Sequence, residues 1–215
     1  MEKITGNKMT QLLNWAYDKA INVSAPGIKN VDQLAREYTN KYPDTDTAIK
    51  HYVHWQERKS GTTGVITGFG GFATMAATLP ADLASVTYIQ LKMVAVIATI
   101  RGYDPHDDEV RSLAFISFLG MSVVDFVKKS GIKATESLGV KVIKKVPQVV
   151  LNKINATVGS RFVTKFGEKG VVNLGKGIPV LGAAVGGGFD YASTARIAHK
   201  AKKNFPDLNV SPTLS

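Results

Sequence analysis

The chain has 215 residues, of which 44% are hydrophobic and 20% are charged. This length suits one domain; the apolar share is too high for a disordered chain, and the charged share is too low for a coiled coil. The absence of cysteine excludes disulfides, thiolate zinc sites, iron–sulfur clusters and cysteine nucleophiles. The formal net charge of +10 favours an anionic partner, either a membrane surface or nucleic acid.

The first sixty residues carry apolar positions at helical spacing, which predict three helices. The first lies within residues 9–21 and is stopped by the Pro-Gly pair at 26–27. The second covers 31–38 and the third covers 46–59. We expect residues 1–45 to form an N-terminal helical extension in front of a main domain at 46–205.

The middle of the chain predicts two longer helices. Residues 82–101 form a long apolar pattern, and Gly102 ends it as the residue just after the helix. Asp104 can cap the next helix, with Pro105 in its first position, and the apolar pattern then continues towards Lys128. Acidic residues follow Pro105 and suit the positive end of the helix dipole.

The last third of the chain is less regular. Valine and lysine alternate in places within residues 138–175, so a short β element there competes with lysine-rich helices broken by glycine. A final helix is expected over 180–204. Residues 206–215 contain two prolines and little periodicity, which predicts a flexible tail.

Two apolar segments, 61–80 and 178–192, are rich in glycine. Glycines on one helix face let two helices approach closely. The expected packing glycines are Gly64, Gly68, Gly71, Gly182 and Gly186. We therefore predict a mostly α-helical single domain, in which two glycine-rich helices pack around the long apolar helix. The uncharged run 61–81 is long enough to cross a bilayer. Residues 61–101 can therefore be either buried within the protein or inserted in a bilayer, and the sequence does not decide between these alternatives.

Positive charge is concentrated in one part of the chain. Residues 1–125 carry 12 basic and 13 acidic side chains, whereas residues 126–203 carry 15 basic and 3 acidic ones. Anionic lipids require only point charges, while nucleic-acid surfaces prefer arginine and stacking aromatics. The lysine-dominated segment thus favours a membrane surface over nucleic acid, with a plain solvated helix face as the alternative. The candidate lipid-binding residues are Lys128, Lys129, Lys133, Lys141, Lys144, Lys145, Lys153, Arg161, Lys165 and Lys169.

Three motifs occur in order along the chain. Residues 64–83 read Gly-x3-Gly-x-Gly-Gly-Phe and end in Leu-Pro-Ala-Asp-Leu; residues 97–105 read Ile-Ala and then Gly-Tyr-Asp-Pro; residues 178–186 read Ile-Pro-Val-Leu-Gly-Ala-Ala-Val-Gly. In this order and spacing the chain resembles the EcsC family over residues 46–205. One departure is Asp190, where the family commonly has asparagine.

The resemblance implies a bacterial protein of a family for which no reaction is established. The EcsC family is also distantly similar to the senescence domain of spartin-like proteins, which associates with lipids. Together with the charge pattern, this predicts a non-enzymatic, lipid-binding protein peripheral to the inner, cytoplasmic face of the cell membrane. Anionic lipids are the expected partner, a membrane protein is a second kind of partner, and no cofactor is expected.

Two other functions compete with this prediction. Asp82, Asp125 and Asp190 each lie within an apolar stretch, where an unpaired carboxylate is costly. If Asp82 and Asp190 converged, they would form the general acid/base pair or cation site of a hydrolase. Capping, or buried pairing with Arg196 or a lysine, is the structural interpretation. The glycine stripes would alternatively build an oligomeric pore that permeabilises membranes.

A weak metal-site candidate lies in the third predicted helix. His51, His54 and Glu57 follow one another at three-residue intervals, so both histidines share one helix face. A zinc site needs three converging protein ligands, and this helix supplies only two comfortably. An aromatic-packed helix beside Tyr52 and Trp55 is the competing interpretation.

Overall fold

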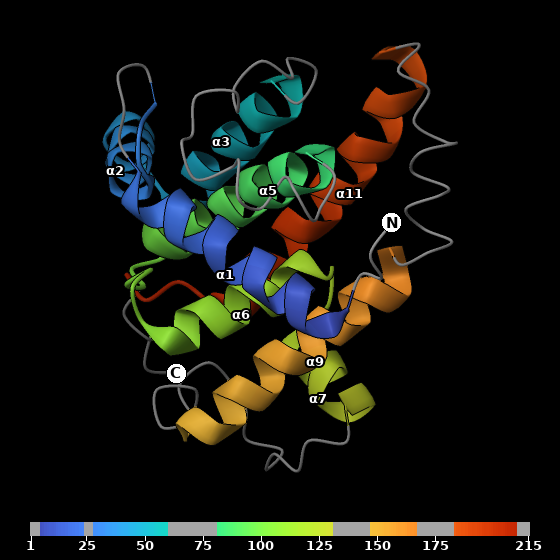
Figure 1. Ribbon diagram of the computed structural model, residues 1–215. Helices are drawn as coiled ribbons and strands as arrows, with labels where there is room; N and C mark the ends of the chain where they lie inside the picture. The colour runs from blue at the N-terminus through green and yellow to red at the C-terminus, as the bar shows by residue number, and fades with distance from the viewer. Residues whose placement is uncertain (1–4, 24–27, 60–80, 131–146, 167–182, 210–215) are drawn as a thin grey trace.

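The computed structural model describes residues 5–23, 28–59, 81–130, 147–166 and 183–209. Within these ranges, the side chains of 57–59, 81–83, 85, 164–166 and 183–192 are not described. The elements are α1 (Gly6–Asn22), α2 (Val31–Lys41), α3 (Thr45–Lys59), α5 (Ala81–Ile100), α6 (Asp108–Phe118), α7 (Val123–Ser130), α9 (Gln148–Phe166) and α11 (Ala183–Asn204). The mostly α-helical class is confirmed (Figure 1).

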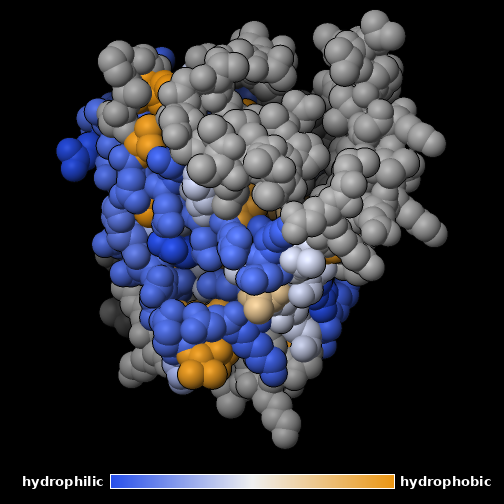
Figure 2. All heavy atoms as spheres, viewed as in Figure 1, coloured by the Kyte–Doolittle hydropathy of each residue, from blue (hydrophilic) through white to orange (hydrophobic). Residues whose placement is uncertain are grey.

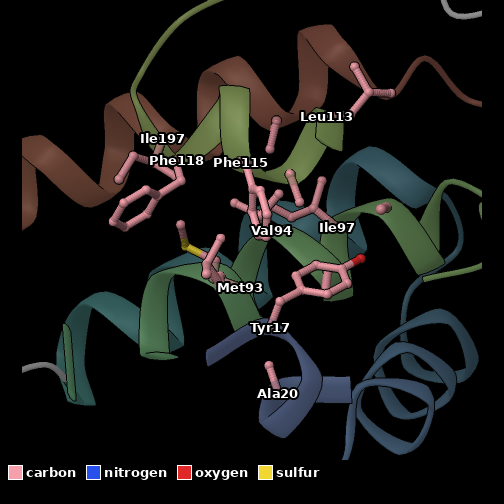
Figure 3. Close-up of a cluster of buried hydrophobic side chains, with 14 of the residues drawn as sticks. Tyr17, Ala20, Met93, Val94, Ile97, Leu113, Phe115, Phe118 and Ile197 are labelled. Atoms are coloured by element: carbon pink, nitrogen blue, oxygen red, sulfur yellow. The ribbon is translucent and has the colours of Figure 1, made fainter. Parts of the chain in front are cut away.

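The long apolar helix is confirmed and lies at the centre of the fold. Helix α5 packs against α1, α2, α3, α6 and α11. Its residues from Met93 to Ala98 are at most 1% exposed, which explains a sequence that is apolar on every face. Figure 3 shows side chains from α1, α5, α6 and α11 meeting in one cluster.

Helix α1 belongs to the same core. Its predicted apolar stripe is buried, and the helix packs along both α5 and α9. The approach to α9 is close at Gly159, where an added Cβ would lie 2.6 Å from the carbonyl oxygen of Gly6 and closer still to the Thr10 hydroxyl. The boundary proposed at residue 46 stays a prediction, although α1 and α2 share one apolar core with the helices that follow.

The expected helix from Asp104 towards Lys128 is wrong at both ends. Asp104 accepts a hydrogen bond from the His106 amide (2.9 Å) in a turn, and α6 begins only after Asp107. The helix ends at Phe118 because Gly120 adopts φ +71°, and α7 then leaves at 84° to α6. The Gly120 amide donates to the Ser117 carbonyl, and the Met121 amide donates to the Ile116 carbonyl. This pair of hydrogen bonds is a Schellman motif.

The same motif ends α5, as the sequence predicted. Gly102 has φ +89°, and the amides of Gly102 and Tyr103 donate to Thr99 and Ala98. An L side chain at a positive φ is strained, so both helix ends depend on glycine.

The C-terminal segment is held against the end of α5. The Leu208 amide donates to the Arg101 carbonyl (3.0 Å), and the Asn209 amide group donates to the Ile100 carbonyl (3.1 Å). Phe205 is fully buried and meets Tyr103 edge-on. Residues 206–209, where the sequence predicted a flexible tail, are therefore bound to α5; residues 210–215 lie outside the described residues.

Within the expected β region 138–175, the described residues belong to α9, apart from Pro147 just before it. The alternating stretch around 140–142 lies outside the described residues. The first glycine-rich segment, 61–80, also lies outside them, and so does Gly182. Gly186 lies in α11, as the predicted final helix requires.

Helix α5 also carries a buried lysine. Lys92 is 8% exposed, and its ammonium donates to the Lys29 carbonyl (2.6 Å) and to the Tyr88 hydroxyl (3.3 Å). Among the described residues, no carboxylate lies within ion-pair distance of it. Burial lowers the pKa of Lys92 to about 8.

We expect this lysine to make stability pH-dependent. Because its pKa is lower in the folded state than the unfolded value near 10.5, folding is opposed below pH 8, and the opposition fades as the pH rises towards 10.5. Lys92→Met should therefore raise the melting temperature relative to wild type most at pH 7. The difference should shrink towards pH 10, and a difference that is constant from pH 7 to 10 would contradict the titration of Lys92.

Candidate functional site

The charged side chains near the end of α5 form a network around the buried side chain of Arg101. Arg101 is 7% exposed, and its guanidinium donates to Asp207 (3.1 Å) and to Asp46 (2.8 Å); Asp46 also lies 2.6 Å from the Lys202 ammonium. Burial alone would raise the pKa of Asp207, but hydrogen bonds from Thr45 and the Asn209 amide, together with the Arg101 charge, lower it. This network joins α3, α5, α11 and the C-terminal segment, so its role is structural.

A second polar centre joins α6, α7 and α11. The Asn204 side chain accepts from the Val123 amide (3.0 Å) and donates to the Ser117 hydroxyl (2.9 Å) and the Met121 carbonyl (3.0 Å). All three partners lie at the break between α6 and α7. Asn204 therefore fixes the start of α7 against the last turn of α11.

Basic residues form a stripe on the exposed side of α11. Arg196, His199, Lys200 and Lys203 follow at the i, i+3, i+4, i+7 spacing of one helix face. Three of them are exposed and Lys200 is partly buried, whereas Thr194, Ile197, Ala198 and Ala201 on the opposite side are buried. We missed this stripe from the sequence; its spacing in residues 196–203 was the available signal.

Helix α7 extends the stripe. Asp125, Lys128 and Lys129 lie on one face of α7, and the Asp125 carboxylate is 3.7 Å from the Lys200 ammonium. A hydrogen bond from Ser122 (2.6 Å) lowers the pKa of Asp125, with help from the nearby charges of Lys200 and Lys203. We call this surface the α7–α11 corner: Asp125, Lys128, Lys129, Arg196, His199, Lys200 and Lys203.

The structure separates the predicted lipid-binding residues into different environments. Lys128 and Lys129 are exposed at the end of α7, and Lys153 is exposed on α9. Arg161 is instead engaged between helices: it donates to the Lys129 carbonyl (2.5 Å), and its guanidinium lies 5.4 Å from the centre of the Phe126 ring. The side chains of Lys133, Lys141, Lys144, Lys145, Lys165 and Lys169 lie outside the described residues.

Exposed valines accompany two of these lysines. Val124 is 49% exposed and lies one turn before Lys128; Val149 is 78% exposed and lies one turn before Lys153. Figure 2 shows a hydrophobic patch within a hydrophilic surface near the N-terminal end of α9. Each lysine thus has an apolar neighbour on its own helix face.

Comparison with known proteins gives one result. The family model described as the EcsC protein family matches residues 1–206 of the chain. The chain belongs to the EcsC family. No curated protein and no solved structure matches it. The EcsC match includes residues 1–45, whereas the motifs recognised in the sequence covered 46–205.

The remaining site candidates of this EcsC protein stay predictions. Asp82 lies in the first turn of α5 and Asp190 lies in α11, but neither side chain is described. His51 stacks on Tyr42 with ring centres 4.1 Å apart, and the Glu57 side chain lies outside the described residues. Among the side chains that are described, no three potential ligands gather into a metal site.

No helix in the described ranges of this EcsC protein has both the length and the apolar character needed to cross a bilayer alone. Helices α6 and α7 meet these criteria only as a pair, bent by 84°. Helix α6 is mostly buried against α5, α9 and α11, so its apolar character is explained by the core.

Proposed function

We propose that this EcsC protein is a non-enzymatic, peripheral lipid-binding protein that docks on anionic membranes through its basic second half. The location that fits this role is the cytoplasmic face of the cell membrane. The supporting observation is a set of exposed basic side chains without a carboxylate partner in the described part of the chain: Lys128, Lys129, Lys153, Arg196 and Lys203.

Residues 1–125 differ from residues 126–203 in the balance and pairing of their charges. In residues 1–125 acids and bases nearly balance, and several are paired, as in Lys29–Glu37 (2.7 Å) and Arg111–Asp18 (2.8 Å). Residues 126–203 carry an excess of 12 positive charges, and among their described side chains Lys200 and Lys202 pair with a carboxylate. An external anionic surface would supply the missing counter-charge.

Docking would proceed in two steps. Exposed lysines are attracted to the negative surface, with about 1 kcal/mol for each basic side chain that reaches it. Val124 and Val149, each one turn from a lysine, would then reach the boundary between headgroups and acyl chains. Two valines bury little apolar area, so electrostatics would dominate and binding would be sensitive to salt.

The test is co-sedimentation with vesicles of phosphatidylglycerol and phosphatidylcholine. We expect the triple variant K128Q/K129Q/K153Q to bind at least about tenfold more weakly than wild type, with a flatter dependence on salt. The matched control, K19Q/K41Q/K50Q, removes the same charge from the first half of the chain and should lose much less. Equal losses in the two variants would show that net charge alone, rather than this surface, governs binding.

A further inference from the structure

We propose that the α7–α11 corner is the surface that contacts lipid phosphates, and that Asp125 restrains this contact by holding Lys200. The inference rests on the proposed function and assigns it to a surface that includes α11. Of the seven corner residues, five are lysine or arginine and one is histidine, and they come from two helices far apart in the sequence.

The geometry lets these groups act together. Residues 196–203 advance about 10 Å along α11, which is close to one Debye length at physiological salt. Their charges therefore add at a single flat anionic surface. The opposite face of α11 is buried in the core, so the stripe is held rigidly and its side chains need only local adjustment to meet phosphates.

The charge distribution along α6 supports one orientation. Asp107, Asp108 and Glu109 lie at the N-terminal end of α6, while the Arg196 side chain lies over Gly120, beyond its C-terminal end. Eleven residues of helix separate the two ends by about 16 Å. A protein with this asymmetry of charge would approach an anionic membrane with the α7–α11 corner facing the membrane and the acidic end of α6 facing away from it.

Asp125 is the one carboxylate of the corner. It lies 3.7 Å from Lys200, and its side chain is half-exposed. An ion pair of this exposure is weak, because solvent screens both charges, so lipid phosphates can displace it. Asp125 also accepts from Ser122, and asparagine can keep that hydrogen bond, so Asp125→Asn removes the competing charge with little structural change.

The partner is assigned as lipid rather than nucleic acid because of the residue types. Four of the corner's side chains are lysines, which act as point charges, and the aromatic ring of α7 nearest to them, Phe126, is buried. Base stacking requires exposed aromatic side chains.

The test compares two pairs of variants on the same anionic vesicles. We expect D125N to bind about two- to fivefold more tightly than D32N, which makes the same charge change on α2. R196Q/K203Q should bind at least about fivefold more weakly than K41Q/K50Q, because both lost charges lie in the corner. All six substituted side chains are exposed or partly exposed, and melting temperatures will verify folding.

The outcomes separate this inference from the proposed function. If wild type binds anionic vesicles but D125N and R196Q/K203Q match their controls, α11 is not part of the contact surface and this inference fails, while docking through Lys128, Lys129 and Lys153 stands. If wild type binds no vesicles, both proposals fail. If R196Q/K203Q instead loses affinity for a DNA duplex that wild type binds in preference to vesicles, the corner is a nucleic-acid surface and the lipid assignment is overturned.

Discussion

Replacing Arg101 with methionine should destabilise the protein by about 3–5 kcal/mol. The guanidinium is buried and bonds two aspartates, of which Asp207 is itself buried with 9% of its side chain exposed. Without Arg101, Asp207 would keep a buried negative charge with no cation beside it, and the C-terminal segment would lose one of its contacts with the end of α5. Urea unfolding followed by circular dichroism measures the loss.

Two controls isolate the cause. Lys29→Gln breaks an exposed pair with Glu37 and should change stability by less than about 1 kcal/mol. The double variant R101M/D207N also removes the unpaired negative charge of Asp207, so it should recover part of the lost free energy of unfolding. If R101M lowers the free energy of unfolding no more than K29Q does, the network around Arg101 does not stabilise this fold.

Gly159→Val should destabilise the protein by about 1–3 kcal/mol or more, because α1 and α9 cross too closely for a side chain. A Cβ at this position would meet the backbone of Gly6 at 2.6 Å as well as the Thr10 hydroxyl. Backbone cannot rotate aside as a side chain does, so the two helices would have to separate. The loss of packing should appear as a lower urea midpoint.

The matched control is Ala156→Val, which adds a branched side chain to the exposed face of the same helix. Its cost should be limited to helix propensity, below about 0.7 kcal/mol. Equal stability of G159V and A156V would mean that the close crossing of α1 and α9 is absent in solution.

The sequence allowed the helices with strong periodicity to be predicted. Helix α5 was evident from an apolar run that Gly102 ends, and α1 from its stripe of buried positions. The break between α6 and α7 was missed because apolar residues continue through Gly120. Only the backbone, with its positive φ and Schellman hydrogen bonds, shows that this glycine ends a helix.

Contacts between distant residues could not be predicted from local patterns. Asp207 looked like part of a loose tail, because its partner Arg101 is 106 residues away. The same is true of the pairing between Asp125 and Lys200: the sequence indicated only that some aspartate would meet an arginine or a lysine. The excess of basic residues in the second half of the chain could be predicted from composition. The stripe on α11 could be predicted only from the helical spacing of its basic residues, not from their number.

The most direct test is co-sedimentation of the wild-type protein with anionic and neutral vesicles at low and high salt. We predict binding to the anionic vesicles at low salt, release of the protein at high salt, and no binding to the neutral vesicles. Equal binding to both kinds of vesicle, or no binding to either, would contradict electrostatic docking as the function of this protein.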